Sequence, residues 1–311
     1  MRILVTGATG QVGNALLKVL GPTNVCIATG RKELDLAQPL QISAALDRIA
    51  PSLIINSAAY TAVDRAEDEK ELAFRINAEA PGAIAHWAAG HGVPLIHFST
   101  DYVFDGESNQ PWREDDLTNP LSVYGSSKLA GEEAIRSAAA PHLIIRTSWV
   151  YAARGANFLR TIARLAKERR ELRIVADQFG APTSARLIAE VVASMLPQDL
   201  GALVERFAAS GSVANVAGSG STTWHGFAVA IVQGLEARGV TLAVESIVPI
   251  ATADYPTKAR RPANSRFDMT RLKEVFRITT PEWHVGLEPE LDQLALELVA
   301  DPTSPRQNTA S

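Results

Sequence analysis

The stretch RILVTGATGQVG, residues 2–13, decides the fold, because it joins a short apolar β-type run directly to a glycine loop. Gly7 permits a tight turn, Gly10 lets backbone amides approach a pyrophosphate, and Gly13 lets the following helix pack closely on the strand. The amino terminus of that helix favours an anion. The loop therefore predicts a dinucleotide site, and its candidate cofactor-binding residues are Gly7, Gly10, Gln11, Val12 and Gly13.

Short apolar runs alternate with helical patterns along the first half of the chain. The runs LIIN (53–56), PLIHFS (94–99) and HLIIRT (142–147) show no in-and-out alternation, which is typical of strands covered on both faces. Regular alternation of this kind predicts an α/β fold, a Rossmann-type doubly wound parallel sheet. Ligands bind such sheets at the carboxyl ends of the strands.

The alternation loosens after residue 150. We therefore expect residues 1–150 to form the dinucleotide-binding domain and residues 151–300 a smaller, mixed, substrate-binding cap. Later segments such as 172–195 are expected to return to the sheet. The last stretch, 301–311, is polar with two prolines, and we expect it to be a disordered tail.

The composition limits which classes of partner and which cellular compartment we expect. The 311 residues carry 30 Lys and Arg against 34 Asp and Glu, a net charge of −4, which disfavours nucleic acid and anionic membrane as partners. Cys26 is the single cysteine, so no internal disulfide forms, and the start of the chain leaves no room for a signal peptide. We expect a cytoplasmic protein. The six histidines are scattered, so we expect no catalytic metal.

A second constellation involves Thr100, Tyr124 and Lys128. Tyr124 and Lys128 are four residues apart at the start of a helical pattern, so they project from one face, one turn apart. Thr100 ends the strand PLIHFS, which we expect beside the glycine-loop strand. With the spacing GxxGxxG, these residues resemble the extended, sugar-nucleotide-modifying branch of the short-chain dehydrogenase/reductase superfamily. The resemblance implies that Thr100, Tyr124 and Lys128 are catalytic.

The resemblance also implies a role for each of the three. Tyr124 donates a proton to a ketone oxygen, Thr100 hydrogen-bonds that oxygen, and Lys128 holds the nicotinamide ribose. The ammonium of Lys128, together with the oxidised nicotinamide, would favour the tyrosine phenolate. Tyr124 and Lys128 thereby count among the cofactor-binding residues as well.

The residues just past the second predicted strand indicate which cofactor is bound. An acid there binds a ribose 2′-hydroxyl and a cation accepts a 2′-phosphate, and this chain has Gly30-Arg31-Lys32. We expect NADPH, with NADH as a second cofactor; the alternative is that Arg31 is merely solvated. By the same resemblance Asp35 and Leu36 contact the adenine side, and Ala58, Ala59, Tyr60 and Thr61 lie under the cofactor.

Five longer motifs narrow the resemblance to one family. A 4,6-dehydratase has Asp-Glu after the triad threonine, whereas this chain has Thr100-Asp101-Tyr102, so dehydration is disfavoured. The chain closely resembles the dTDP-4-dehydrorhamnose reductase family from residue 2 to roughly residue 295. The matching motifs are STDYVFDG (99–106), NPLSVYG (119–125), RTSWVY (146–151), DQFGAPT (177–183) and RRPANS (260–265).

This family resemblance implies reduction of the 4-keto group of dTDP-4-dehydro-L-rhamnose with NADPH. The substrate-binding residues it implies are Thr100, Asp101, Tyr102, Trp149 and Arg261. Arg260 and Arg261 have the charge to hold a diphosphate or carboxylate; a solvated basic loop is the alternative. The family also admits a homodimer. Some members hold a magnesium ion at a dimer contact through an acidic residue in the first helix, whereas this chain has Asn14-Ala15, which argues against a metal-bridged dimer.

Two other functions stay open on the sequence alone. One is a non-catalytic, cofactor-binding regulatory subunit like the β subunit of methionine adenosyltransferase. The intact Thr100, Tyr124 and Lys128 set argues against it, because a pure binder needs no polarised phenol. The other is reductase or epimerase action on a different nucleotide sugar.

Overall fold

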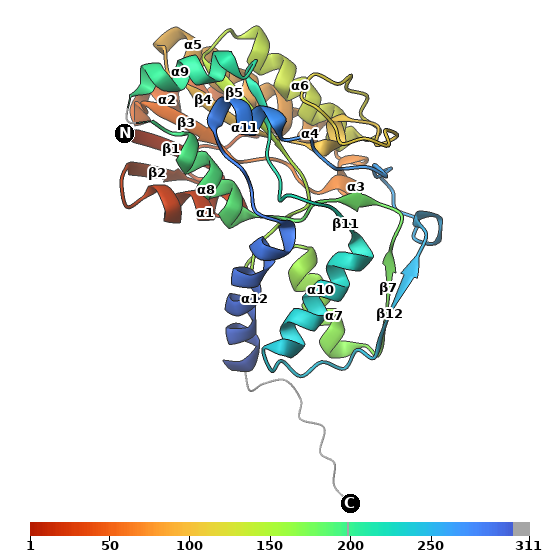
Figure 1. Ribbon diagram of the computed structural model, residues 1–311. Coiled ribbons are helices and arrows are strands. Elements are labelled where there is room, and N and C mark those ends of the chain that lie inside the picture. Colours follow the sequence, from red (N-terminus) through yellow and green to blue (C-terminus); the bar gives the residue numbers. More distant parts are fainter. Residues whose placement is uncertain (198, 301–311) are drawn as a thin grey trace, which may run out of the picture.

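The computed structural model describes residues 1–197 and 199–300. It has a larger part, in which helices flank a central sheet, and a smaller part built on the helices α7 (Phe158–Glu168), α10 (Trp224–Ala237) and α12 (Trp283–Ala300) (Figure 1). Within the described residues no single helix is long and apolar enough to cross a membrane, although α8 and α9 meet that test when joined as a bent pair.

The central sheet has six parallel strands in the order β10-β5-β4-β3-β1-β2, which confirms the predicted doubly wound α/β fold. Strands β3, β4 and β5 are buried along their whole length, as their unbroken apolar runs predicted. One expectation was wrong: β4 does not lie beside the glycine-loop strand β1, because β3 pairs with both. The strands are β1 (Arg2–Thr6), β2 (Val25–Thr29), β3 (Leu53–Asn56), β4 (Leu95–Thr100), β5 (His142–Thr147) and β10 (Val213–Asn215).

Helices cover both faces of this sheet (Figure 1). On one face, side chains such as Leu16, Ile188 and Leu272 share a hydrophobic core with the strands. On the other face, Leu46, Ile84 and Ile135 do the same. The first face carries α1 (Gln11–Leu20), α8 (Ala185–Met195), α9 (Leu200–Ala209) and α11 (Thr270–Phe276); the second carries α2 (Ile42–Ile49), α5 (Ala80–His91) and α6 (Val123–Ser137).

The smaller part has its own hydrophobic core, in which Leu159, Phe227 and Leu291 meet. It contains α7 (Phe158–Glu168), α10 (Trp224–Ala237) and α12 (Trp283–Ala300), with β7 (Glu171–Val175) parallel to β12 (Ser246–Ile250). Two short pairs join it to the sheet part: β6 (Val150–Tyr151) with β9 (Thr183–Ser184), and β8 (Phe179–Gly180) with β11 (Thr222–Thr223).

The chain crosses between these two cores more than once. Helix α8 packs on α1, and β10 extends the sheet beyond β5, so segments after residue 150 do return to it. Strand β7, at the start of the segment 172–195, instead pairs with β12 in the smaller part. The domain boundary near residue 150 stays a prediction, and the expected tail at 301–311 lies outside the described residues.

The chain also forms several short helical segments outside the long helices. Between β3 and β4 the chain forms α3 (Val63–Ala66), α4 (Lys70–Phe74) and a π-helical turn (Arg75–Glu79) before α5. Turns of this kind occur frequently at functional sites. The 3₁₀ turns are Pro39–Gln41, Asp101–Val103 and Thr252–Asp254.

Candidate active site

Thr100, Tyr124 and Lys128 meet at the carboxyl edge of the sheet. Thr100 is the last residue of β4, and Tyr124 lies in the first turn of α6, one turn before Lys128. The side chain of Ser122 caps this helix by accepting a hydrogen bond from the Gly125 amide at 3.1 Å, which fixes where α6 begins. All three side chains are buried.

The Tyr124 phenol is held in a low-dielectric site. Burial raises its pKa above the usual value of a tyrosine, and a hydrogen bond with Thr100 only partly offsets this. Its ring meets the ring of Tyr102 edge to face, with centroids 5.4 Å apart. The phenol is therefore protonated at neutral pH in this structure, as a proton donor must be.

Lys128 is held by strand β4. Its Nζ donates to the Phe98 carbonyl oxygen at 2.6 Å and lies 3.0 Å from Nε2 of His97. Burial lowers the pKa of its amine to about 8, although the nearby Glu132 carboxylate raises it. That Lys128 favours the phenolate stays a prediction, because it also requires the oxidised nicotinamide; in the free protein burial dominates the pKa of Tyr124.

Asp101 connects the triad to the carboxyl-terminal half. Its Oδ1 accepts from Thr100 Oγ1 at 3.0 Å and its Oδ2 accepts from Ser265 Oγ at 2.5 Å. Burial raises the pKa of this carboxyl to about 6, even though both hydrogen bonds lower it. Asp101 is therefore a carboxylate fixed by two hydrogen bonds, and it loses its charge as the pH falls through about 6.

The glycine loop forms a tight cradle between β1 and α1. Gly7 has φ +63°, and a Cβ there would lie 2.8 Å from the backbone of Ala58. A Cβ on Gly13 would lie 2.3 Å from the Gly7 carbonyl oxygen, so helix and loop touch as the motif predicted. Gly10 begins α1 without any side-chain cap, which leaves the first amides, those of Gln11 and Val12, for an anion.

The candidate residues for the adenosine end follow β2. Arg31 and Lys32 are exposed there, and the ion pairs of the described residues do not include them. Asp35 accepts from the Ala37 amide at 2.9 Å and so fixes its own loop. Leu36 is buried in the core beneath that loop.

The segment from Ala58 to Thr61 leaves β3 beside the glycine loop. Tyr60 is clamped by Asn77 of the π-helical turn, whose Oδ1 accepts from the Tyr60 amide at 2.8 Å and whose Nδ2 donates to the Tyr60 carbonyl at 3.0 Å. Asn77 Nδ2 also donates to Ser127 Oγ on α6 at 3.0 Å. This residue ties the predicted cofactor segment to the helix that carries Tyr124 and Lys128.

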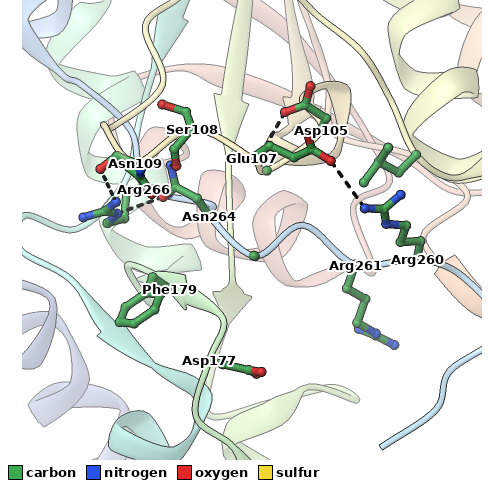
Figure 2. A pocket seen from close by; sticks show the side chains of 13 residues that line it. Asp105, Glu107, Ser108, Asn109, Asp177, Phe179, Arg260, Arg261, Asn264 and Arg266 are labelled. Atoms are coloured by element: carbon green, nitrogen blue, oxygen red, sulfur yellow. Dashed lines mark hydrogen bonds and ion pairs between the residues drawn. The ribbon is translucent and has the colours of Figure 1, made fainter. Parts of the chain in front are cut away.

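A cavity of about 490 Å³ opens between the loop after β4 and the segment 260–266 (Figure 2). Arg261 lies in its wall, where it donates to Asp64 Oδ2 at 2.9 Å and hydrogen-bonds the Tyr102 phenol. Figure 2 shows Arg260 turned instead toward Glu107, at 3.4 Å. Through Arg261 and Tyr102 the cavity connects to Tyr124, although the triad itself does not line it.

Trp149 lies just beyond β5 in a left-handed backbone conformation, with φ +49°. This conformation is strained for a bulky residue and often marks a functional site. Its indole stacks on Trp224 of the smaller part, with ring centroids 3.6 Å apart. Trp149 therefore bridges the two parts at the edge where the sheet ends, and its contact with substrate stays a prediction.

A second cavity, of about 270 Å³, lies between the start of α1 and the helices α8 and α12. Asn14 and Ala15 line it, and across it Arg186 pairs with Glu290 at 3.2 Å. In the part of the chain that the structure describes, no group of three His, Cys, Asp or Glu side chains could hold a metal ion.

Comparison with known proteins places these features in one family. Residues 1–296 match the family model of the RmlD substrate binding domain. The chain is 47% identical over 293 residues to the dTDP-4-dehydrorhamnose reductase of Burkholderia thailandensis, covering 92% of this chain and 97% of that one. It is 43% identical over 298 residues to that of Escherichia coli, covering 94% and 98%.

Solved structures agree with this. The dTDP-4-dehydrorhamnose reductase of Clostridium acetobutylicum superposes with a TM-score of 0.84 at 35% identity, covering 94% of this chain and 99% of that one. The Bacillus anthracis enzyme, solved in complex with NADP, gives a TM-score of 0.82 at 33% identity over the same shares of the two chains. This chain therefore belongs to the dTDP-4-dehydrorhamnose reductase family.

Proposed function

We propose that this protein reduces the 4-keto group of dTDP-4-dehydro-L-rhamnose with NADPH and releases dTDP-L-rhamnose. The observation that carries the proposal is the meeting of Thr100, Tyr124 and Lys128 at the carboxyl edge of the sheet, where the buried Tyr124 phenol hydrogen-bonds Thr100. Family membership supplies the substrate, because the similar enzymes of Burkholderia and Escherichia carry that activity in their names.

Each residue of the triad has a separate role in the reduction of the carbonyl group. Bound NADPH supplies the hydride that the carbonyl carbon receives. Tyr124 gives its hydroxyl proton to the carbonyl oxygen, and Lys128 in its ammonium form stabilises the resulting phenolate. The Thr100 hydroxyl, which donates to Asp101 in this structure, turns to the carbonyl oxygen as negative charge develops there.

The glycine loop fits a dinucleotide. Side chains at Gly7 and Gly13 would collide with backbone, and the uncapped amides at the start of α1 face the space where a pyrophosphate would lie. Asp35, Leu36 and the segment 58–61 would hold the adenosine and nicotinamide portions. We assign the 2′-phosphate to Arg31, which is exposed beyond β2.

Replacing Arg31 by alanine is expected to raise KM for NADPH more than KM for NADH. A guanidinium can form a charge-assisted, two-pronged bond with the 2′-phosphate, and NADH has no such group. Steady-state kinetics with both cofactors measure the effect, with Lys32→Ala as the matched neighbour. Equal effects on both cofactors would remove Arg31 as the residue that recognises the phosphate.

The substrate would lie between the triad and the 490 Å³ cavity. We assign the sugar to Asp101, Tyr102 and Trp149, and the diphosphate to Arg261 with Arg260 nearby. The charge of Arg261 is already balanced by Asp64, so a diphosphate would compete with that carboxylate for the guanidinium. A homodimer stays a prediction.

The rate of reduction is expected to fall as the pH drops below about 6, because Asp101 takes up a proton there. Once Thr100 has turned to the carbonyl oxygen, Oδ1 of Asp101 can accept from a sugar hydroxyl, and a protonated Asp101 accepts less freely because one of its oxygens has become a donor. The pH dependence of kcat/KM measures this acidic limb. Asp101→Asn should be slower throughout and should lack that limb; a limb unchanged in the variant would assign it to another group.

One assay tests the proposal as a whole. The purified protein is mixed with NADPH and dTDP-4-dehydro-L-rhamnose, the absorbance of the reduced nicotinamide is followed, and the sugar product is identified. Decay that forms dTDP-L-rhamnose supports the proposal. Decay only with other nucleotide sugars would assign a different substrate, and no decay with tight binding to another protein would favour a regulatory subunit.

A further inference from the structure

A row of three polar side chains crosses the centre of the sheet. Thr6 on β1 is in register with Asn56 on β3, and Asn56 is in register with His97 on β4. All three are at most 2% exposed, and the residues just before them on the same strands, Val5, Ile55 and Ile96, are buried and apolar. Buried polar groups cost folding free energy unless they are fully hydrogen-bonded, so the connections of this row carry the argument.

The row is bonded from end to end. Thr6 Oγ1 donates to Asn56 Oδ1 at 2.6 Å, and Asn56 Nδ2 lies 3.0 Å from His97 Nδ1. His97 Nε2 lies 3.0 Å from Nζ of Lys128. At the other end the Ala58 amide donates to Thr6 Oγ1 at 3.2 Å. The row therefore connects the predicted cofactor segment after β3 to the lysine of the triad.

The orientation of the Asn56 carboxamide in this structure determines which nitrogen of His97 carries the proton. Thr6 donates to the carboxamide oxygen of Asn56, and the NH₂ group of Asn56 faces His97. That group only donates, so Nδ1 accepts, and a neutral imidazole then carries its proton on Nε2. This N–H faces Lys128, whose Nζ accepts it as a neutral amine while donating its own proton to Phe98.

Protonating Lys128 upsets this arrangement. An ammonium has no lone pair, so its N–H and the Nε2–H of His97 would face each other as two donors. The conflict disappears when the imidazole proton moves to Nδ1 and the Asn56 carboxamide turns over to accept it. The charge on Lys128 and the tautomer of His97 are therefore linked.

We propose that His97 is a positioning residue for Lys128, which it holds by a hydrogen bond and whose proton it couples to its own tautomer through Asn56. The inference rests on the proposed function only for its catalytic consequence: the ammonium form stabilises the Tyr124 phenolate, so the row controls how much of that form is present. The coupling itself exists in the free protein.

The other groups around the row agree with this assignment. On β5, His142 is in register with Leu95, two residues before His97, and burial lowers the pKa of both imidazoles, that of His97 well below its usual range. From α6, Glu132 favours the ammonium of Lys128, and α5 presents apolar side chains to the sheet. His97 is thus neutral at ordinary pH, and Lys128 is the group that titrates, with a pKa of about 8.

Nuclear magnetic resonance of the free protein tests the coupling without substrate or cofactor. The ring nitrogens of ¹⁵N-labelled histidine are followed from about pH 6 to about pH 10, and His97→Gln identifies the His97 signals by their loss. We expect a neutral His97 that changes from Nδ1–H to Nε2–H as the pH rises, with a midpoint of about 8. One tautomer across the whole range would overturn the proposal, whether or not the protein reduces the proposed sugar.

Two variants test the catalytic consequence. The carboxamide introduced by His97→Gln can accept from the ammonium through its oxygen and shares no proton, so the basic limb of kcat/KM should move up by about one pH unit. His97→Leu removes the partner, so kcat should fall about tenfold or more and the limb should move down. If the folded leucine variant keeps both the kcat and the basic limb of the wild type, His97 does not position Lys128. If that variant does not fold, the tautomer measurement on the wild type still decides.

Discussion

Replacing Tyr124 by phenylalanine is expected to reduce kcat by about 10²- to 10⁴-fold and to leave NADPH binding nearly unchanged. The variant keeps the ring and its edge-to-face contact with Tyr102, so the site stays filled. It removes only the hydroxyl, which is buried and hydrogen-bonded to Thr100. Turnover is measured by NADPH consumption with the proposed sugar, and binding by titration of NADPH fluorescence.

Tyr102 offers the matched control for that variant. Its side chain is half-buried, and burial raises the pKa of its hydroxyl to about 12, but its partner is Arg261 on the substrate side. Tyr102→Phe should therefore raise KM for the sugar nucleotide more than it lowers kcat. A Tyr124→Phe protein that retains most of its activity would show that the proton comes from another group.

The features that sequence reasoning predicted lie close together along the chain. The glycine loop is a local motif, because the turn at Gly7 and the contact of Gly13 with it involve residues six positions apart. Tyr124 and Lys128 share one helix face, which a spacing of four residues already indicates. The buried strands were visible as unbroken apolar runs.

The features that were missed join segments far apart in sequence. Ser265 reaches Asp101 across 164 positions, and Asn77 holds Tyr60 through a π-helical turn that interrupts an ordinary helical pattern. No local periodicity records either contact. His97 gave one signal, a titratable residue inside an otherwise apolar strand, but its partner on α6 follows only from how helix and sheet pack.

Burial opposes the expected effect of Lys128 on the phenol in the free protein. From the sequence, Lys128 is four residues from Tyr124 and carries a positive charge, so a lowered tyrosine pKa follows from proximity. In the folded chain the amine is turned toward Phe98 and His97, and removal from water raises the pKa of the phenol. The position of β4 was misjudged for a different reason: β3 pairs with both β1 and β4, and nothing in the sequence marks its place between them.

Replacing Arg146 by alanine is expected to lower the free energy of unfolding by about 3–5 kcal/mol, because it leaves the Glu132 carboxylate buried without its main partner. Arg146 Nε and Nη2 donate to the two oxygens of Glu132 at 3.0 and 2.7 Å, and neither side chain is more than 2% exposed. Its guanidinium also lies over the ring of Phe104, 5.0 Å from the centroid. Urea unfolding at neutral pH measures the loss.

Arg136 also pairs with Glu132, and its replacement is the control that compares a partly exposed partner of this carboxylate with the buried one. Arg136 donates to Glu132 Oε2 at 2.8 Å, but its side chain is 39% exposed, so Arg136→Ala should cost only about 1 kcal/mol or less.

The sign of the pH dependence follows from Glu132: burial raises the pKa of its carboxyl, but the bonds from Arg146 outweigh this and hold it below the usual value. The stability that this carboxylate contributes is therefore present above its unfolded pKa of about 4.3 and is lost as the pH falls through the lower folded value. In Arg146→Ala the carboxyl takes up its proton at higher pH, so the deficit relative to the wild type should be largest at neutral pH and should narrow as the medium is acidified. Equal losses in the two variants, or a deficit that does not change with pH, would mean that the buried charge on Glu132 is not what Arg146 stabilises.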